Sequence, residues 1–279
     1  MLLIADSGSS KIDWATIDKG GNIRYFETEG FNPYYKKTEE LYKTVEKELL
    51  PMIDKDLVEE IYFYGSGCST DSKKMNVEDT LKESFGHIAV FIEHDLFGAA
   101  RALLGKQEGI ACILGTGSNS CYYDGKEIVE NVPSLGYLYG DEGSGTYIGK
   151  LLITAYLQNK LPGSLKKGFE NKYNMSLEAI LDASYNKGRP NIFLSSFSGF
   201  ISEHISDNFL KNMVRVSFED FFHLQILKYK KYDKATISFT GSVAYVFRDI
   251  LTEVAKKFKV KIGKIERKPI HGLVEFHRQ

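Results

Sequence analysis

The sequence has few cysteines and no long apolar segment. Its cysteines, Cys68, Cys112 and Cys121, are odd in number and lack the spacing of a metal site. This excludes a small disulfide-stapled domain and favours a reducing compartment. No apolar run reaches the roughly 18 residues that a membrane span needs, and no basic leader precedes the first predicted strand. We therefore expect a cytoplasmic protein without a membrane partner.

The chain also lacks an excess of charge of either sign. It has 36 Lys and Arg against 37 Asp and Glu, a net charge of −1. Without a basic surplus it is not suited to wrapping nucleic acid or coating an anionic membrane. With 279 residues and 43% hydrophobic content it can form one large domain or two medium ones. The composition agrees with a soluble enzyme and indicates little else.

A short motif occurs twice, 109 positions apart. Residues 4–11 and 113–120 each combine an apolar run with a turn of small residues, and Gly8 and Gly117 occupy equivalent positions. Glycine and serine let a backbone approach a ligand closely and direct N–H groups and hydroxyls at a phosphate. The repeat predicts two similar lobes with a nucleotide between them.

The first part of the chain predicts three strands followed by alternating helices and strands. The strands are expected at 2–5, 12–17, 23–28, 61–64 and 88–92, and the helices at 38–53, 77–85 and 96–104. Three antiparallel strands followed by βα units are typical of a ribonuclease-H-like half-domain. The pattern begins again near residue 109.

The second part repeats the strands and adds helical insertions. Strands are expected at 110–114, 119–123, 127–131 and 260–265, and a strand with its turn at 235–241. Helices are expected at 146–159, 177–185 and 244–258, a long helical stretch at 193–230, and a turn at 269–272. Gly105–Gly109 is the best boundary. We expect lobes at 1–106 and 107–279, and leave open that the last residues pack back on the first lobe.

Six segments together resemble a known family. They are residues 6–11, 31–33, 95–101, 115–119, 140–145 and 241–244. In this order the chain resembles N-acetylglucosamine kinase-like members of the BadF/BadG/BcrA/BcrD-type ATPase group, in the superfamily of sugar kinases, heat-shock chaperone ATPases and actin. The resemblance implies an α/β fold of two ribonuclease-H-like (actin-like ATPase) lobes, each with a mixed five-stranded sheet flanked by helices.

The resemblance also implies ATP and Mg²⁺ as cofactors. Asp6 is either a turn residue or the carboxylate that holds the water shell of a Mg²⁺ ion bridging ATP phosphates. The expected nucleotide contacts are Asp6, Gly8, Ser9, Ser10, Lys11, Gly115, Thr116, Gly117, Ser118, Gly241 and Ser242.

Asp95 is the predicted catalytic residue. It lies where a predicted strand ends and a helix begins, so from its position alone it is equally a helix N-cap. The resembling kinases place a general base here, which takes the proton from the sugar hydroxyl as it attacks the γ-phosphorus. One residue can fill both roles.

The sugar site is expected from the same resemblance. It implies contacts from Asn32, Asp95, Thr116, Gly136 and Asp141. From their positions alone, Asn32 is a turn residue and Asp141 offsets a helix dipole. The chain departs from the animal enzyme's pattern at 134–136, where Ser-Leu-Gly replaces a Gly-Trp-Gly-like run.

We therefore expect an ATP-dependent kinase of an amino sugar, N-acetylglucosamine or a close relative. One alternative is an ATPase of the dehydratase-activator type, which needs cysteine thiolates for an iron–sulfur cluster. Another is a non-catalytic sugar or nucleotide sensor. The expected partner is a small sugar, with no nucleic acid, and a homodimer is left open.

Overall fold

The computed structural model describes residues 1–186 and 188–278. These residues divide into two compact units. Unit 1 contains Met1–Lys106 and the segment from Lys268 onward, and unit 2 contains Gln107–Arg267. Unit 2 is thus inserted, in sequence, between two segments of unit 1.

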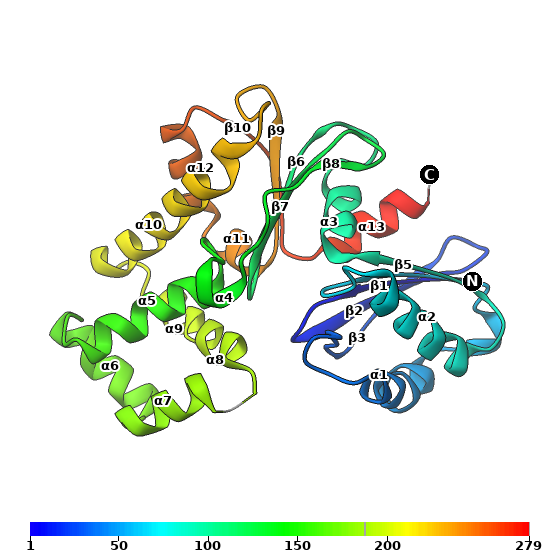
Figure 1. Ribbon diagram of the computed structural model, residues 1–279, viewed down its shortest axis with the longest axis horizontal. Helices are drawn as coiled ribbons and strands as arrows, with labels where there is room; N and C mark the ends of the chain where they lie inside the picture. Colours follow the sequence, from blue (N-terminus) through cyan, green and yellow to red (C-terminus); the bar gives the residue numbers. More distant parts are fainter. Residues whose placement is uncertain (187, 279) are drawn as a thin grey trace. The chain divides into compact units, whose positions relative to one another are not determined.

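Unit 1 is built on a mixed sheet, which has five strands among the described residues in the order β3-β2-β1-β4-β5 (Figure 1). The strands are β1 (Leu2–Ser7), β2 (Lys11–Ile17), β3 (Ile23–Glu29), β4 (Glu60–Gly65) and β5 (Ala89–His94). The first three are antiparallel neighbours, and β4 and β5 run parallel to β1. The predicted meander followed by βα units is confirmed.

The helices of unit 1 include one whose hydrogen-bond pattern changes along its length. They are α1 (Thr38–Thr44), α2 (Asp71–Phe85), α3 (Asp95–Leu104) and α13 (Pro269–His277), with a 3₁₀ turn at Lys55–Leu57. After α1 the chain continues as a π-helical turn (Val45–Leu49) and a 3₁₀ turn (Leu50–Met52). The Leu50 N–H bonds to the Val45 carbonyl, five residues back, which is the π-helical pattern. The next residue, Pro51, has no N–H and cannot continue the i→i−4 pattern of an α-helix.

One predicted helix boundary and one predicted turn in unit 1 are wrong. α2 begins six residues before the predicted position 77, because Thr70 caps it by accepting a hydrogen bond from the Lys73 N–H at 3.4 Å. The expected turn at 269–272 is the start of α13, with Pro269 at the first helical position, where a missing N–H costs nothing. Gly272 is needed for packing, since a Cβ there would lie 2.3 Å from the Ala102 carbonyl oxygen of α3.

The sheet of unit 1 has a different helix layer on each face. α1 and α2 cover the face that carries Trp14, whose ring packs edge-on against Phe63 with centroids 6.0 Å apart. α13 packs on α3, β1 and β2. Because side chains alternate along a strand, Asp13 points away from the Trp14 face. Asp6 is its direct partner across the strands, so the α3–α13 side of the sheet carries both carboxylates.

Unit 2 is built on a second mixed sheet, again five-stranded within the described residues, in the order β10-β9-β6-β7-β8. The strands are β6 (Gly109–Leu114), β7 (Ser118–Tyr123), β8 (Ile128–Glu130), β9 (Thr236–Thr240) and β10 (Lys261–Glu266). β6, β7 and β8 are antiparallel neighbours, and β9 and β10 run parallel to β6. The two sheets share one topology, as the sequence repeat predicts.

The helices of unit 2 differ from the prediction in number and length. They are α4 (Gly136–Tyr139), α5 (Gly145–Leu157), α6 (Gly163–Tyr173), α7 (Leu177–Tyr185), α8 (Pro190–Ser196), α9 (Ser198–Glu203), α10 (Asn208–Leu224), α11 (Ser242–Val246) and α12 (Arg248–Lys257), with a 3₁₀ turn at Ile226–Lys228. The predicted helical stretch 193–230 is divided into several helices, and Asp207 starts the longest of them, α10, by accepting the Phe209 N–H at 2.8 Å. α6 was not predicted, and the predicted helix 244–258 is divided at Phe247.

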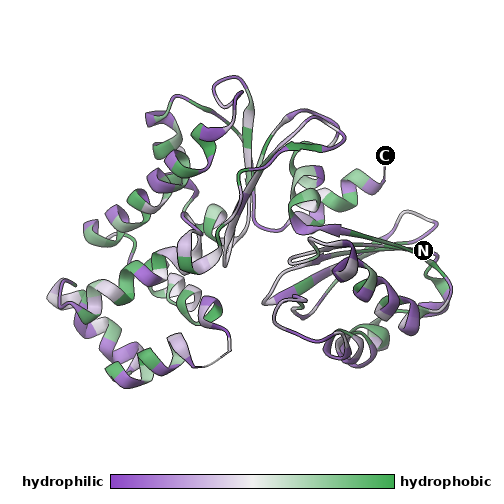
Figure 2. Ribbon diagram, viewed as in Figure 1, coloured by the Kyte–Doolittle hydropathy of each residue, from purple (hydrophilic) through white to green (hydrophobic). Residues whose placement is uncertain are grey.

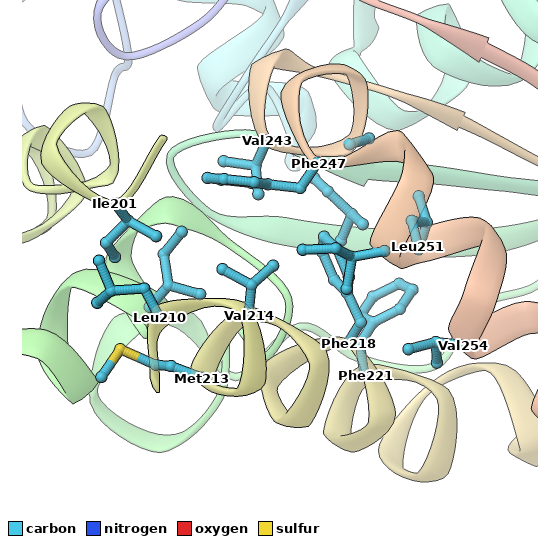
Figure 3. Close-up of a cluster of buried hydrophobic side chains, with 14 of the residues drawn as sticks. Ile201, Leu210, Met213, Val214, Phe218, Phe221, Val243, Phe247, Leu251 and Val254 are labelled. Carbon is cyan, nitrogen blue, oxygen red and sulfur yellow. The ribbon is translucent and has the colours of Figure 1, made fainter. Parts of the chain in front are cut away.

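A buried apolar cluster holds the helices of unit 2 against its sheet. Figure 3 shows Val214 and Phe218 of α10 directed toward Val243 and Leu251 of α11 and α12. Full burial of each such side chain contributes about 1.5–3 kcal/mol. The helices mix polar and apolar residues along their length (Figure 2), and no helix in the described part of the chain is both long and apolar enough to cross a membrane.

Candidate functional site

Three strands of unit 1 end at one edge of the sheet. The β1–β4 and β4–β5 registers place Ser7 beside Gly65 and Gly65 beside His94. Consequently the Gly8–Ser10 turn, the Ser66–Cys68 turn and the first turn of α3 begin side by side. The carboxyl ends of parallel strands are where open α/β sheets bind ligands.

The turn after β1 is the first predicted phosphate motif. The Gly8 N–H donates to the Lys11 carbonyl at 2.9 Å, and the Gly30 N–H donates to the Ser10 carbonyl at 3.2 Å. A Cβ on Gly30 would lie 2.3 Å from the Lys11 nitrogen, so the chain after β3 packs closely against this turn. Gly8, Ser9 and Ser10 therefore have the compact geometry expected of a phosphate-binding turn.

Asp6 lies near the end of β1 in an acidic environment. Its burial, together with the negative charges of Asp13 and Asp95, raises the pKa of Asp6 to about 8 against the partial offset of Lys11 and Lys268. A carboxyl that is reluctant to ionise beside two other carboxylates favours a bound cation. The ionisation of Asp6 is thus coupled to that of Asp95.

Lys11 does not extend freely from the turn. Its Nζ lies 2.8 Å from Glu27 and 3.5 Å from Asp13, and Lys268 Nζ lies 2.6 Å from Asp13 and 3.1 Å from Glu27. These four residues form a network of alternating charge beside Asp6. The predicted contact of Lys11 with a phosphate would require it to leave these carboxylates.

Asn32 is buried, and both groups of its amide are hydrogen-bonded within unit 1. Its Nδ2 donates to the Ser9 hydroxyl at 3.1 Å and to the Ser66 hydroxyl at 3.3 Å, and its Oδ1 accepts the Tyr34 N–H at 2.9 Å. A Cβ on Gly67, whose φ is +80°, would lie 2.4 Å from Oδ1. Asn32 therefore joins the turns that follow β1 and β4 and is also the turn residue expected from its position.

Asp95 is the first residue of α3 and lies at the same edge. Its Oδ1 accepts the Leu96 N–H at 2.9 Å. The N-cap position of α3 is held by the preceding residue, His94, whose Nδ1 lies 3.1 Å from the Leu96 nitrogen and 2.9 Å from Asp95 Oδ1. The side chain of Asp95 is 22% exposed, so it is accessible from solvent.

The second phosphate motif forms a comparable turn in unit 2. The Gly115 N–H donates to the Gly117 carbonyl at 3.0 Å, and the Gly145 N–H donates to the Gly115 carbonyl at 2.8 Å. The Thr146 hydroxyl donates to the Thr116 carbonyl at 2.6 Å. The start of α5 therefore supports residues 115–117.

Asp141 lies against this turn rather than at the start of the next helix. It adopts φ +59° and its Oδ1 accepts the Ser118 N–H at 3.1 Å and the Ser134 hydroxyl at 3.4 Å. A Cβ on Gly117 would lie 3.2 Å from both carboxylate oxygens. Burial raises the pKa of Asp141 although these hydrogen bonds lower it. Gly136, with φ +67°, begins α4 and has open space around its Cα.

The adenosine motif also lies at the end of a strand. Gly241 follows β9 and Ser242 begins α11. Gly241 adopts φ +112°, and a Cβ there would lie 2.4 Å from the Leu114 carbonyl oxygen. Glycine is thus required by the chain itself, next to Gly115.

The three cysteines are buried, free and unsuited to hold a cluster. Burial raises the pKa of the Cys68 and Cys121 thiols to about 12 and that of Cys112 well above its usual range. Within the described residues, no three Cys, His, Asp or Glu side chains are grouped as metal ligands. These cysteines behave as small apolar residues, which argues against the iron–sulfur alternative.

The structure groups the predicted residues by unit and adds some that the sequence interpretation missed. Asp6, the 8–10 turn, Asn32 and Asp95 lie at one edge of unit 1, and residues 115–118 lie beside Asp141 in unit 2. Ser66 and His94 were missed. A Gly-Ser-Gly turn directly after the predicted strand 61–64 was the available signal for Ser66.

Comparison with solved structures finds a relative of high identity. The chain is 39% identical to a candidate N-acetylglucosamine kinase from Porphyromonas gingivalis over 99% of its length and 98% of that chain, with a TM-score of 0.95. A candidate N-acetylglucosamine kinase from Chromobacterium violaceum is 16% identical over 99% of this chain and 98% of that chain, with a TM-score of 0.74. The Schistosoma mansoni hexokinase in complex with glucose is 15% identical over 99% of this chain and 84% of that chain, with a TM-score of 0.51. At these identities the two matches show the fold alone. No family model and no curated protein matches the chain.

Proposed function

Because the chain belongs to the N-acetylglucosamine kinase-like family, within the actin- and hexokinase-like ATPase superfamily, we propose that it is an ATP-dependent kinase that phosphorylates a hydroxyl of an amino sugar. N-acetylglucosamine or a close relative is the proposed substrate. The observation that carries the proposal is the position of Asp95, a partly exposed carboxylate at the same sheet edge as the Gly8–Ser10 turn and Asp6.

The proposed chemistry is phosphoryl transfer from ATP to an alcohol. An uncharged hydroxyl is a poor nucleophile, so it needs a base within hydrogen-bond reach. Asp95 accepts that proton as the oxygen attacks the γ-phosphorus, and the backbone N–H groups of the two glycine turns orient the phosphates. Gly241 and Ser242 are proposed to lie against the adenosine.

The residues around Asp6 fit a Mg²⁺ ion that keeps its water ligands better than an ion held by protein ligands alone. The acidic neighbours that raise the pKa of Asp6 provide the negative potential that a cation relieves. Mg²⁺ typically keeps several waters and is held by one or two carboxylates together with substrate phosphates. When bound, the ion would neutralise charge that develops on the phosphates. Asp6 is proposed to hold its water shell.

The proposed sugar contacts come from both units. In unit 1, Asn32 retains one acceptor lone pair on Oδ1 beside the hydroxyls of Ser9 and Ser66. In unit 2, Asp141 is proposed to bind a sugar hydroxyl, with Thr116 and Gly136 beside it. Polar groups of this kind reject a sugar that lacks the matching hydroxyl.

A sugar screen tests the proposal. ADP release from ATP and Mg²⁺ is measured with N-acetylglucosamine, glucosamine, N-acetylmuramic acid, N-acetylmannosamine and glucose. We expect sugar-dependent release that is highest with an N-acetylated amino sugar and absent without Mg²⁺. ADP release that no sugar stimulates, from a folded protein that binds ATP, would remove the kinase assignment.

A further inference from the structure

The carboxylate of Asp95 is held on one of its two oxygens. Oδ1 lies 2.9 Å from the Leu96 nitrogen and 2.9 Å from Nδ1 of His94. The side chains of His94 and Asp95 are 29% and 22% exposed, so the pair is mostly enclosed. Both of these contacts are made to the same oxygen, Oδ1.

The His94 Nδ1 atom has two neighbours and can serve only one of them in a given protonation state. It lies 3.1 Å from the Leu96 nitrogen, for which it would be an acceptor, and 2.9 Å from Asp95 Oδ1, for which it would be a donor. The Leu96 N–H is closer to Oδ1, at 2.9 Å, and a carboxylate is the stronger acceptor. The favoured arrangement is therefore one in which Nδ1–H and Leu96 N–H both donate to Oδ1.

We propose that His94 is a positioning residue for the base: its Nδ1–H fixes Oδ1 of Asp95 and leaves Oδ2 as the oxygen that takes the proton from the substrate hydroxyl. This inference rests on the proposed kinase function. It concerns a residue adjacent to the base, and it assigns different tasks to the two oxygens of one carboxylate.

The charged groups around the pair are compatible with a donating Nδ1. Lys74 of α2 is paired with Glu93 of β5 at 2.6 Å, which limits its effect on the ring. The thiol of Cys68, whose pKa is raised to about 12 by burial, stays neutral. Burial lowers the pKa of His94, but the hydrogen bond and charge of Asp95 raise it overall. Both the imidazolium and the Nδ1–H tautomer keep the donor.

A purely structural role for His94 makes different predictions. Its position is that of the N-cap of α3, and a cap can be exchanged for another capping residue without effect on the chemistry. Asn at position 94 caps helices well and places an N–H₂ donor near the position of Nδ1. Asp caps equally well and has the size of Asn but cannot donate. Ala neither caps nor donates.

The test compares His94→Asn, His94→Asp and His94→Ala with the parent. Removal of a hydrogen bond to a charged group costs about ten- to a hundredfold, so on the pH plateau we expect kcat of the Asp and Ala variants to fall by that amount and Asn to stay within about threefold. The KM values for ATP and the sugar should stay near those of the parent in all three variants, because the hydrogen bond acts on the base and not on substrate binding. Melting temperatures show whether each variant is folded.

Equal plateau kcat for Asn and Asp, or a folded Ala variant that keeps the parent kcat, would show that His94 is only a cap. A measurement without substrate keeps the two proposals apart. The ¹⁵N spectrum of the His94 ring in the parent should show a proton on Nδ1, the atom that lies 2.9 Å from Asp95 Oδ1, whether or not a sugar is phosphorylated. If Nδ1 carries no proton, the inference fails while the kinase function stands.

Discussion

Asp95 has two candidate roles that the sequence alone does not separate, the start of a helix and a general base. It begins α3 and accepts the Leu96 N–H, yet the capping position belongs to His94. A neutral side chain that accepts the Leu96 N–H could therefore replace most of what the Asp95 charge contributes to the helix end. The proposed chemistry, by contrast, needs the ionised carboxylate.

We expect Asp95→Asn to lower kcat by about 10² to 10⁴ with little change in melting temperature, because Asn keeps the shape but cannot accept the proton. Asp95→Ala should give a similar loss. Both are measured by steady-state kinetics and by thermal melts. If the Asn variant turned over at close to the parent rate, Asp95 would not be the base.

The strand-end residues could be predicted from the sequence because their chemistry is local. Asp6, the Gly8 turn and Asp95 each follow an apolar run, and the structure places them at one edge. Ser66 and His94 could not be assigned in the same way, because their contacts with Asn32 and Asp95 depend on strand register and turn geometry. The pairing of Lys11 with Glu27 was hidden for the same reason.

At the scale of elements, strands were predicted better than helices. A strand in a buried sheet is identified by its own apolar run, whereas helix ends depend on caps and packing. The interruption before α10 follows from a single side chain, Asp207. Pro269 and Gly272 were interpreted as a turn because both residues are common there. Here the proline starts α13, and the glycine permits close contact with Ala102 of α3.

The docking of α13 depends on a neutral histidine. Arg101 of α3 donates to the Tyr64 hydroxyl at 2.8 Å, and that hydroxyl lies 2.9 Å from Nε2 of His277. With Arg101 as a donor to its oxygen, the Tyr64 hydroxyl can give its own proton to Nε2 of a neutral His277. Burial first, and then the charge of Arg101, lower the pKa of His277 to about 4.

We expect this histidine to make unit 1 less stable in mild acid. Its pKa when folded, about 4, is below the ordinary value of 6.5, so the unfolded chain binds the proton more tightly. Above about pH 6.5 His277 does not change the free energy of unfolding. As the pH falls from there toward about 4, His277 lowers the free energy of unfolding progressively. Urea unfolding of the parent and His277→Gln at several pH values checks this. Parallel pH profiles for the two proteins would contradict it.

At the scale of the whole molecule, the two units differ in chain continuity. Unit 2 is one continuous segment, whereas unit 1 needs α13 to complete the face that carries Asp6 and Asp13. Ile270, Leu273 and Val274 of α13 are at most 2% exposed. Burial of each contributes about 1.5–3 kcal/mol, which together is comparable with the about 5–15 kcal/mol that stabilises a domain.

We expect the fragment 107–267 to fold alone and the fragment 1–106 not to do so. Joining 268–278 to residue 106 through a flexible glycine and serine linker should restore a cooperative melt. Circular dichroism during thermal and urea unfolding measures each case. The same linked fragment with Leu273→Asp is the matched control and should remain unfolded. A cooperative melt of 1–106 alone would show that α13 is dispensable.

The split of unit 1 also sets an order of events on the ribosome. Residues 1–106 emerge before unit 2 and before Lys268. Until Lys268 is made, Asp13 lacks this partner and the side of the sheet that binds α13 is uncovered. Translation proceeds at about 5–20 residues per second, so the insertion of unit 2 delays the completing segment by roughly ten to thirty seconds. During that interval the nascent first unit exposes an apolar surface beside its acidic strand ends. It is then a target for chaperones, and the second unit, although synthesised later, is the first able to fold completely.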